Sequence, residues 1–93
     1  MRPAINPAAP SSAEVMAAIT ETIRSVSAKA REMAISADSL LLEDLALDSL
    51  DLVAVVIQLQ DQFEVEIDPD EINSIRTVSE LAASLQRQVR AAA

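Results

Sequence analysis

The sequence predicts an all-α protein with four helices, three longer and one short, and a long loop after the first helix. Apolar residues recur at helical spacing in three long segments, and capping boxes at Ser11–Glu14 and Thr77–Glu80 mark two helix starts. Only in the run Glu64–Ile67 do charged and apolar residues alternate as in a strand, and no other segment has a pattern that could pair with it in a sheet. The chain of 93 residues is therefore expected to form one helical domain.

The domain is expected to cover residues 11–90. Residues 1–10 contain three of the four prolines and show no periodicity, so they are expected to be a disordered tail. Residues 91–93 are expected to be a second, shorter tail.

The first helix is expected to run from Ser12 to Glu32. Its apolar residues are Val15, Ile19, Ile23, Val26 and Ala30. A long loop over residues 33–48 should follow and pack on the helices, because five of its residues are large and apolar. These are Ile35, Leu41, Leu42, Leu45 and Leu47.

The second helix is expected to run from Asp48–Ser49 to Phe63 and is apolar on two sides. One stripe fits a core face: Leu52, Val55, Val56, Leu59 and Phe63. At 100° per residue, a second stripe lies nearly opposite: Leu50, Ala54 and Ile57, with Val53 at its margin and Asp61 below. A chain of this size can hardly enclose a helix completely, so part of the second stripe is expected to be exposed to a partner. The alternative is a loop folded over that stripe.

The remaining helices follow an extended loop over residues 64–67. Asp68-Pro69 is a helix start, with a short third helix expected over about residues 70–75. The box at Thr77 opens a fourth helix with Val78, Leu81, Ala82, Leu85 and Val89 on one face. Glycine is absent, so any left-handed turn must use another residue at some cost.

Composition excludes several classes of function. The formal net charge of −8 argues against binding to nucleic acid or anionic membranes. There is no His and no Cys, so His-dependent catalysis and thiolate metal sites are not available. We expect a protein that is not an enzyme, holds no metal and is monomeric. Without an apolar leader or membrane span, it is also expected to be cytoplasmic.

The acidic charge is concentrated in the middle of the chain. Residues 38–71 contain no basic residue and eleven acidic ones: Asp38, Glu43, Asp44, Asp48, Asp51, Asp61, Glu64, Glu66, Asp68, Asp70 and Glu71. This can be a merely solvated surface or a surface for a partner with a basic patch. The alternation at residues 64–70 suggests a calcium loop, but Pro69 stands where such a loop needs glycine.

The most informative residue is Ser49, which stands between two acids at the expected start of the second helix. Its plain structural role would be a helix cap worth about 1 kcal/mol. The chain lacks a base to activate it, so any reaction at Ser49 needs another protein. A helix start suits a phosphodiester, because unpaired N–H groups and the positive dipole end lie there.

The run Leu42-Glu43-Asp44-Leu45-Ala46-Leu47-Asp48-Ser49-Leu50-Asp51 resembles the phosphopantetheine attachment motif of the acyl carrier protein family. The resemblance continues through Phe63-Glu64-Val65-Glu66-Ile67 and again at Ile75-Arg76-Thr77-Val78. It implies an antiparallel four-helix bundle. It also implies that a phosphopantetheinyl transferase attaches 4′-phosphopantetheine covalently to Ser49, and that the thiol of this arm carries acyl groups as thioesters.

The resemblance further implies that the second helix docks on basic patches of partner enzymes, among them acyl-transferring and ketosynthase-type enzymes of fatty-acid, polyketide or related biosynthesis. The partner-binding residues would be Asp48, Leu50, Asp51, Val53, Ala54, Ile57 and Asp61. The core stripe would line a cleft for a short acyl chain.

Two departures from the family pattern carry information. Ala46 stands where the family usually has glycine, which affects the turn before Ser49. Fatty-acid carriers usually show more glutamates along the second helix, where this chain has Ala54, Gln58 and Gln60. The recognition face is thus more apolar, which favours a dedicated partner set in a specialised pathway such as polyketide synthesis.

Two alternatives remain open. A peptidyl or aminoacyl carrier usually shows paired glycines before the Asp-Ser pair, and this chain has none. An unmodified helical interaction module, with Ser49 only capping a helix, would gain no mass from coenzyme A and a broad-specificity transferase.

Overall fold

The computed structural model describes residues 11–92, apart from the side chain of Ala92. The helices are α1 (Ser12–Val26), the short 3-10 helix η1 (Lys29–Glu32), α2 (Ser49–Phe63), α3 (Pro69–Ser74) and α4 (Val78–Ala92). The predicted all-α class is confirmed, since the only β pairing within the described residues is one isolated bridge between Leu40 and Thr77. The expected tail at residues 1–10 lies outside this range.

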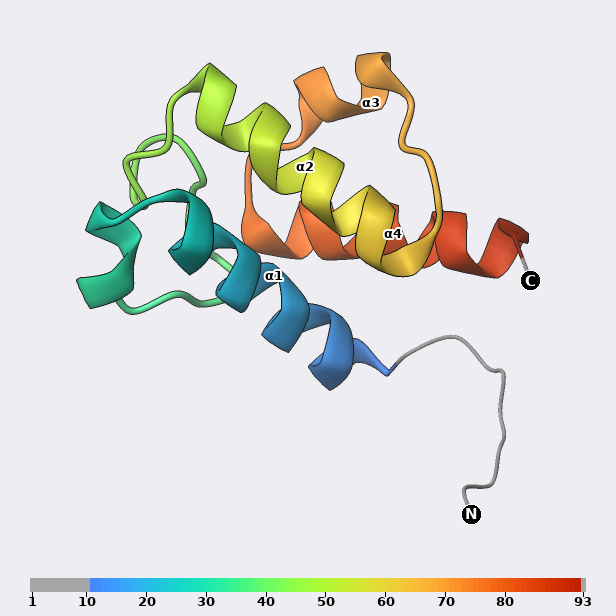
Figure 1. The fold of residues 1–93 in the computed structure, drawn as a ribbon, viewed down its shortest axis with the longest axis horizontal. Helices are drawn as coiled ribbons and strands as arrows, with labels where there is room; N and C mark the ends of the chain where they lie inside the picture. The colour runs from blue at the N-terminus through green and yellow to red at the C-terminus, as the bar shows by residue number, and fades with distance from the viewer. Residues whose placement is uncertain (1–10, 93) are drawn as a thin grey trace.

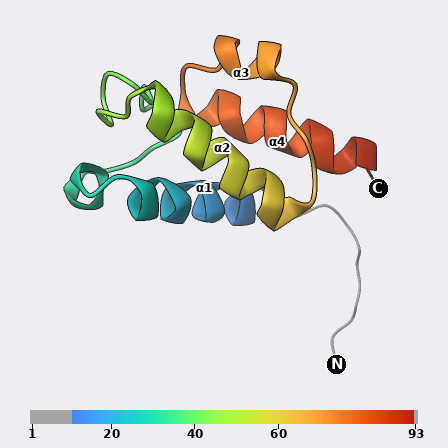
Figure 2. The same cartoon turned by 45° about the horizontal axis from the view of Figure 1, so that its top comes forward.

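The four α-helices alternate in direction, as an antiparallel bundle requires. Figures 1 and 2 show α1 and α3 running one way and α2 and α4 the other. The closest helix packing joins α1, α2 and α4, whereas α3 lies on the outer side and contains no fully buried residue. The core lies among the three long helices, and the loop before α2 closes one end of it.

The helix starts follow the predicted capping chemistry. The Ser11 hydroxyl accepts a hydrogen bond from the amide of Glu14 (3.1 Å), whose carboxylate accepts one from the amide of Ser11 (2.8 Å). Thr77 and Glu80 exchange the same pair of bonds at the start of α4. These boxes satisfy amides that have no partner within a helix.

The expectation of one helix from Ser12 to Glu32 is wrong, because α1 ends at Val26. Ser27 adopts an extended conformation (φ −120°, ψ 116°), and its hydroxyl accepts a hydrogen bond from the amide of Ala30 (3.4 Å). A serine hydroxyl that bonds to a nearby amide competes with the helical pattern. A new 3-10 turn, η1, therefore begins and still buries Ala30 completely.

One further boundary and one burial prediction need revision. α4 continues through Ala92, two residues beyond the expected end of the domain. Leu41, Leu45 and Leu47 are buried as predicted, but Leu42 is 49% exposed, so the expectation that all five apolar loop residues are buried is wrong. The loop follows no regular period, and burial therefore depends on tertiary contacts that periodicity cannot show.

Side chains of two glutamines help to hold α2 in place. Gln62 donates to the Thr22 hydroxyl of α1 (2.9 Å). The side-chain oxygen of Gln60 accepts from the amide of Ile67 (2.7 Å), which ties the extended segment before α3 to α2. Glu64, the C-cap of α2, has a left-handed conformation (φ 58°). Glycine usually occupies such a cap, and this chain has none, so another residue must adopt the conformation.

Candidate functional site

The loop before α2 is an ordered segment whose backbone folds back on itself. The amide of Asp44 donates to the carbonyl of Leu40 (2.9 Å), and the amide of Leu47 donates to the carbonyl of Leu41 (3.2 Å). The Asp44 carboxylate accepts a further bond from the amide of Leu40 (2.9 Å). Leu41, Leu45 and Leu47 anchor the loop in the core. The start of α2 is therefore fixed in space.

A capping box between Asp48 and Asp51 begins α2. The Asp48 carboxylate accepts from the amide of Asp51 (2.8 Å), and the Asp51 carboxylate accepts from the amide of Asp48 (3.3 Å). Asp48 is the helix cap, so the plain capping role considered for Ser49 is wrong. Ser49 is exposed as the first residue of the helix, and its hydroxyl is not needed to begin it.

Ser49 offers an acceptor hydroxyl, and the ionisable side chains nearest to it in the sequence are the carboxylates of Asp48 and Asp51. The chain has no His or Cys, and its one lysine, Lys29, lies in η1. Within residues 11–92 no cluster of three or more acidic side chains is arranged to hold a metal ion. This finding includes the acidic residues 64–70.

The outer face of α2 is apolar and exposed, beginning one residue after Ser49. Leu50 is 80% exposed, Ile57 56% and Val53 45%. Ala54 is half-buried beside them, and Asp61 is exposed near the end of the helix. No loop covers this stripe, in agreement with the expectation that part of it is exposed. Large apolar side chains grouped in this way usually mark an interaction surface.

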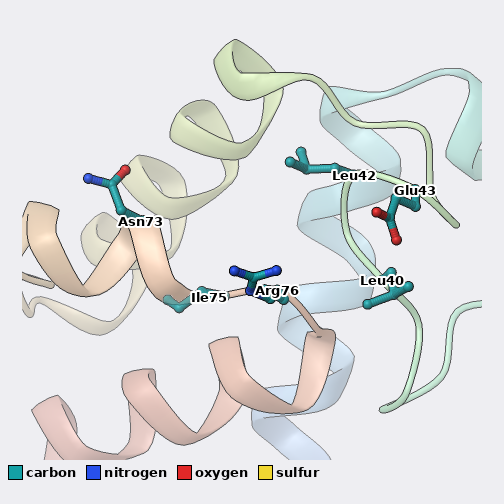
Figure 3. A pocket seen from close by; sticks show the side chains of 6 residues that line it. All are labelled: Leu40, Leu42, Glu43, Asn73, Ile75 and Arg76. Carbon is teal, nitrogen blue, oxygen red and sulfur yellow. The ribbon is translucent and has the colours of Figure 1, made fainter.

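A cavity of about 290 Å³ lies between the long loop and the junction of α3 with α4. Three apolar residues (Leu40, Leu42, Ile75) and three polar ones (Glu43, Asn73, Arg76) line it. Figure 3 shows Arg76 lying between the loop side chains on one side and Asn73 and Ile75 on the other. The prediction from sequence did not identify this cavity, because its residues come from three segments without a shared motif.

Comparison with known proteins identifies the family. The family model for the phosphopantetheine attachment site matches residues 17–85, which include Ser49. The chain belongs to the acyl carrier protein family. An acyl carrier protein of Bdellovibrio bacteriovorus is 30% identical over 57 residues, which are 61% of this chain and 73% of the relative.

Solved acyl carrier proteins share the fold. One from Thermotoga maritima superimposes with a TM-score of 0.78 at 23% identity, covering 88% of this chain and 94% of that one. A Mycobacterium tuberculosis structure named as an acyl carrier protein gives a TM-score of 0.69 at 30% identity, covering 76% and 93% of the two chains. The acetyl form of the actinorhodin carrier from Streptomyces coelicolor gives 0.62 at 22% identity, covering 91% and 96%.

Membership in the acyl carrier protein family gives the turn before Ser49 a specific meaning. Ala46 has a left-handed backbone (φ 58°) at the position where the resemblance indicated glycine. This conformation costs a residue with a Cβ atom about 1–2 kcal/mol. Alanine in place of glycine therefore strains the loop locally, and the backbone at this position still makes a left-handed turn.

An ion pair joins α3 and α4. Arg87 donates to the Glu71 carboxylate, whose side chain is 23% exposed. The nearby hydroxyl of Ser84 and the Arg87 guanidinium lower the pKa of Glu71 below its usual value. The Ser84 hydroxyl is buried and has no partner at normal hydrogen-bond geometry. Among the described residues, Glu71 and Arg87 form the one ion pair between α3 and α4.

No described helix has both the length and the apolar character needed to cross a membrane.

Proposed function

We propose that Ser49 carries the 4′-phosphopantetheine arm of this acyl carrier protein. The observation that carries the proposal is the exposed hydroxyl of Ser49 at the first position of α2, with the capping role taken by Asp48. The matched family region, residues 17–85, includes this serine, and the run around it resembles the attachment motif. A hydroxyl that the fold does not use can be modified without loss of stability.

The attachment reaction breaks a phosphoanhydride bond of coenzyme A and forms a phosphodiester at Ser49. The Ser49 oxygen attacks the phosphorus that bears pantetheine in coenzyme A, and the P–O bond to the departing adenosine 3′,5′-bisphosphate breaks. The hydroxyl proton passes to a base of the transferase, since the two carboxylates nearest in sequence, Asp48 and Asp51, accept the amide bonds of the capping box. Mg²⁺ bound by the transferase balances the charge on the phosphates. In this protein the loop and the capping box hold the attacking oxygen in position.

The exposed stripe of α2 is the proposed docking surface for the transferase and for acyl-transferring and ketosynthase-type enzymes. Leu50, Val53, Ala54 and Ile57 supply apolar contact, and Leu50, next to Ser49, is the most exposed of them. Asp48, Asp51 and Asp61 supply negative charge for basic patches. Such charges mainly raise the association rate, whereas the apolar centre contributes most of the affinity.

The composition of this stripe supports a specialised pathway, such as polyketide synthesis, for the carrier. Gln60 is bound to the amide of Ile67, so at this position the side chain serves the fold and not acidic recognition. Gln58 is exposed and neutral, and Ala54 is half-buried. A partner adapted to a more acidic helix would find fewer carboxylates here. Full activity with a housekeeping malonyl transferase and elongation system would contradict this assignment.

The attachment is tested by intact-mass analysis after incubation with coenzyme A, Mg²⁺ and a broad-specificity transferase. We expect the wild-type protein to gain the mass of one phosphopantetheinyl group and Ser49→Ala to gain none. Ser39→Ala is the matched control, because Ser39 lies in the loop before α2 and is buried. No mass gain in the wild-type protein, or a gain in Ser49→Ala, would refute the proposal.

A further inference from the structure

We propose that Leu42 is a docking residue for the phosphopantetheinyl transferase, which would hold the carrier by apolar contacts on both sides of Ser49. Leu50 lies on the α2 side of Ser49, and Leu42 extends the docking surface onto the loop before α2. The partner that fits is a transferase with an apolar pocket next to its basic patch. The inference rests on the docking of α2 proposed above.

The exposure of Leu42 is unusual for this chain. Its neighbour Leu41 is fully buried, whereas Leu42 is 49% exposed. A single apolar side chain on a surface is common and by itself indicates nothing. Within residues 11–92, however, only four large apolar side chains are exposed, and the other three belong to the exposed stripe of α2. Leu42 is therefore the one exposed large apolar side chain of the described residues that lies outside that stripe.

The backbone at Leu42 is held in place through its neighbour Leu41. The amide of Leu41 donates to the carbonyl of Arg76 (2.9 Å), and the carbonyl of Leu41 accepts from the amide of Leu47 (3.2 Å). The side chain of Leu41 lies in the core. A partner would thus meet an apolar side chain on an ordered backbone, and binding would cost little conformational entropy at this point.

Leu42 lies close enough to Ser49 for one partner to cover both. The hydrogen bond between Leu41 and Leu47 limits the Cα separation of Leu42 and Ser49 to at most about 18 Å. A standard interface buries about 800 Å² on each partner, equivalent to a disc roughly 32 Å across. Figure 3 shows the Leu42 side chain pointing out from the loop, on the side where α2 begins. An interface centred between the two residues therefore covers both.

A contact on the loop would also orient Ser49 for the reaction. Contacts along a single helix leave a partner free to roll about the helix axis, whereas a contact off the helix fixes that rotation. A misplacement on the order of 1 Å can reduce a rate on the order of 100-fold. Leu42 would thus help to align the Ser49 oxygen with the phosphorus of coenzyme A, in addition to strengthening binding.

Cross-saturation maps this surface without any reaction. The carrier is perdeuterated except for its Leu, Ile and Val methyl groups, and the aromatic protons of a broad-specificity transferase are saturated in the absence of coenzyme A. We expect the Leu42 methyl signals to lose intensity within about twofold of the loss at Ile57. Val89, half-buried near the end of α4, should lose at least about threefold less. A response at Ile57 without one at Leu42 would overturn the proposal and leave the docking of α2 intact.

Substitutions test the contribution of Leu42 to the reaction. Leu42→Ala should raise the KM of the transferase for the apo protein about threefold to tenfold, since only the exposed half of a leucine remains to be buried. Leu42→Met keeps an apolar side chain of similar size and should stay within about twofold of wild type. Ala34→Ser, at an exposed position near the start of the same loop, is the matched control and should behave likewise. Unchanged KM and kcat values for Leu42→Ala would overturn the proposal.

Other roles for Leu42 give different results. The apo protein carries no arm, so a side chain that contacts only the arm or its acyl group would leave this KM unchanged, and the proposal would fail. Methyl shifts of Leu42 that depend on concentration in the carrier alone would assign the surface to a second copy of the chain and would overturn it as well. Absence of modification in the wild-type protein would refute attachment at Ser49, whereas cross-saturation at Leu42 would still decide the docking.

Discussion

The two sides of α2 differ in what they contribute to the protein. Toward α1 and α4, Leu59, Val55 and Val56 are buried at 0–1% exposure. On the other side, Leu50 and Ile57 are more than half exposed. A cavity lies between the long loop and the junction of α3 with α4. The residues are of the same chemical type on one helix. Their position alone decides whether a side chain stabilises the fold or is available to a partner.

The largest effect should come from the buried side. Leu59→Ala should destabilise the fold by about 2–5 kcal/mol, because it removes a fully buried side chain and leaves a cavity. This is a large share of the roughly 5–14 kcal/mol expected for a chain of this length. Urea unfolding followed by circular dichroism measures it. The matched change Ile57→Ala, on the exposed side, should stay within about 0.5 kcal/mol of wild type. Similar losses for both would show that the two sides do not differ.

The exposed side should instead respond in partner binding. Ile57→Ala should raise the KM of the transferase for the apo protein about fivefold to thirtyfold, since an apolar anchor near the centre of an interface contributes about 1–2 kcal/mol. Steady-state modification rates at varied carrier concentration measure it. Gln58→Ala, at the neighbouring exposed position, should change KM by less than about twofold. An unchanged KM for Ile57→Ala would remove this stripe from the docking surface.

The loop before α2 should gain stability from a glycine. Ala46→Gly should stabilise the protein by about 0.5–1 kcal/mol, because relief of left-handed strain exceeds the added entropy of the unfolded chain. Urea midpoints provide the measurement. Ala34→Gly, an exposed loop position without a positive φ, should instead cost a few tenths of a kcal/mol. A loss of stability in Ala46→Gly would contradict strain at this turn.

The smallest effect should be the loss of the ion pair that holds α3. Because the pKa of Glu71 is lowered in the folded state, its contribution is present above the unfolded pKa of about 4.5 and is lost as pH falls through the folded pKa. Arg87→Gln should therefore lower the melting temperature by about 1–3 °C near neutral pH. The difference in melting temperature between Arg87→Gln and wild type should vanish in acid. Arg90→Gln is the control and should show no such pH dependence. A loss of melting temperature in Arg87→Gln that is the same at all pH values would argue against the Glu71 pair.

Sequence patterns predicted most of this fold for identifiable reasons. The bounds of α2 follow from stripes with helical spacing and the start of α4 from a capping box, which are local signals. The end of α1 was missed because Ser27 bonds to Ala30 and opens a new turn, a choice that apolar periodicity does not reveal. The exposure of Leu42 depends on where α3 and α4 meet, and no local rule contains that information.

The candidate site divides in the same way. Ser49 and the exposed stripe could be proposed from the sequence, since both lie on one regular helix whose faces are set by its period. The cavity around Arg76 required three-dimensional contacts between the loop, α3 and α4. The capping role of Asp48 is local, but the sequence analysis considered Ser49 for that role. Arg76 appeared in the sequence only as part of the run before the last helix, with no chemical signal of its own.

The most direct test of the account is to locate the modification within the chain. Trypsin should release residues 32–76 as one peptide, because no Lys or Arg lies between Arg31 and Arg76, and its serines are Ser36, Ser39, Ser49 and Ser74. After treatment with coenzyme A and transferase, fragmentation mass spectrometry should place a single phosphopantetheinyl group on Ser49. A group on any of the other three serines, or an unmodified peptide under conditions that load a known carrier, would contradict the account.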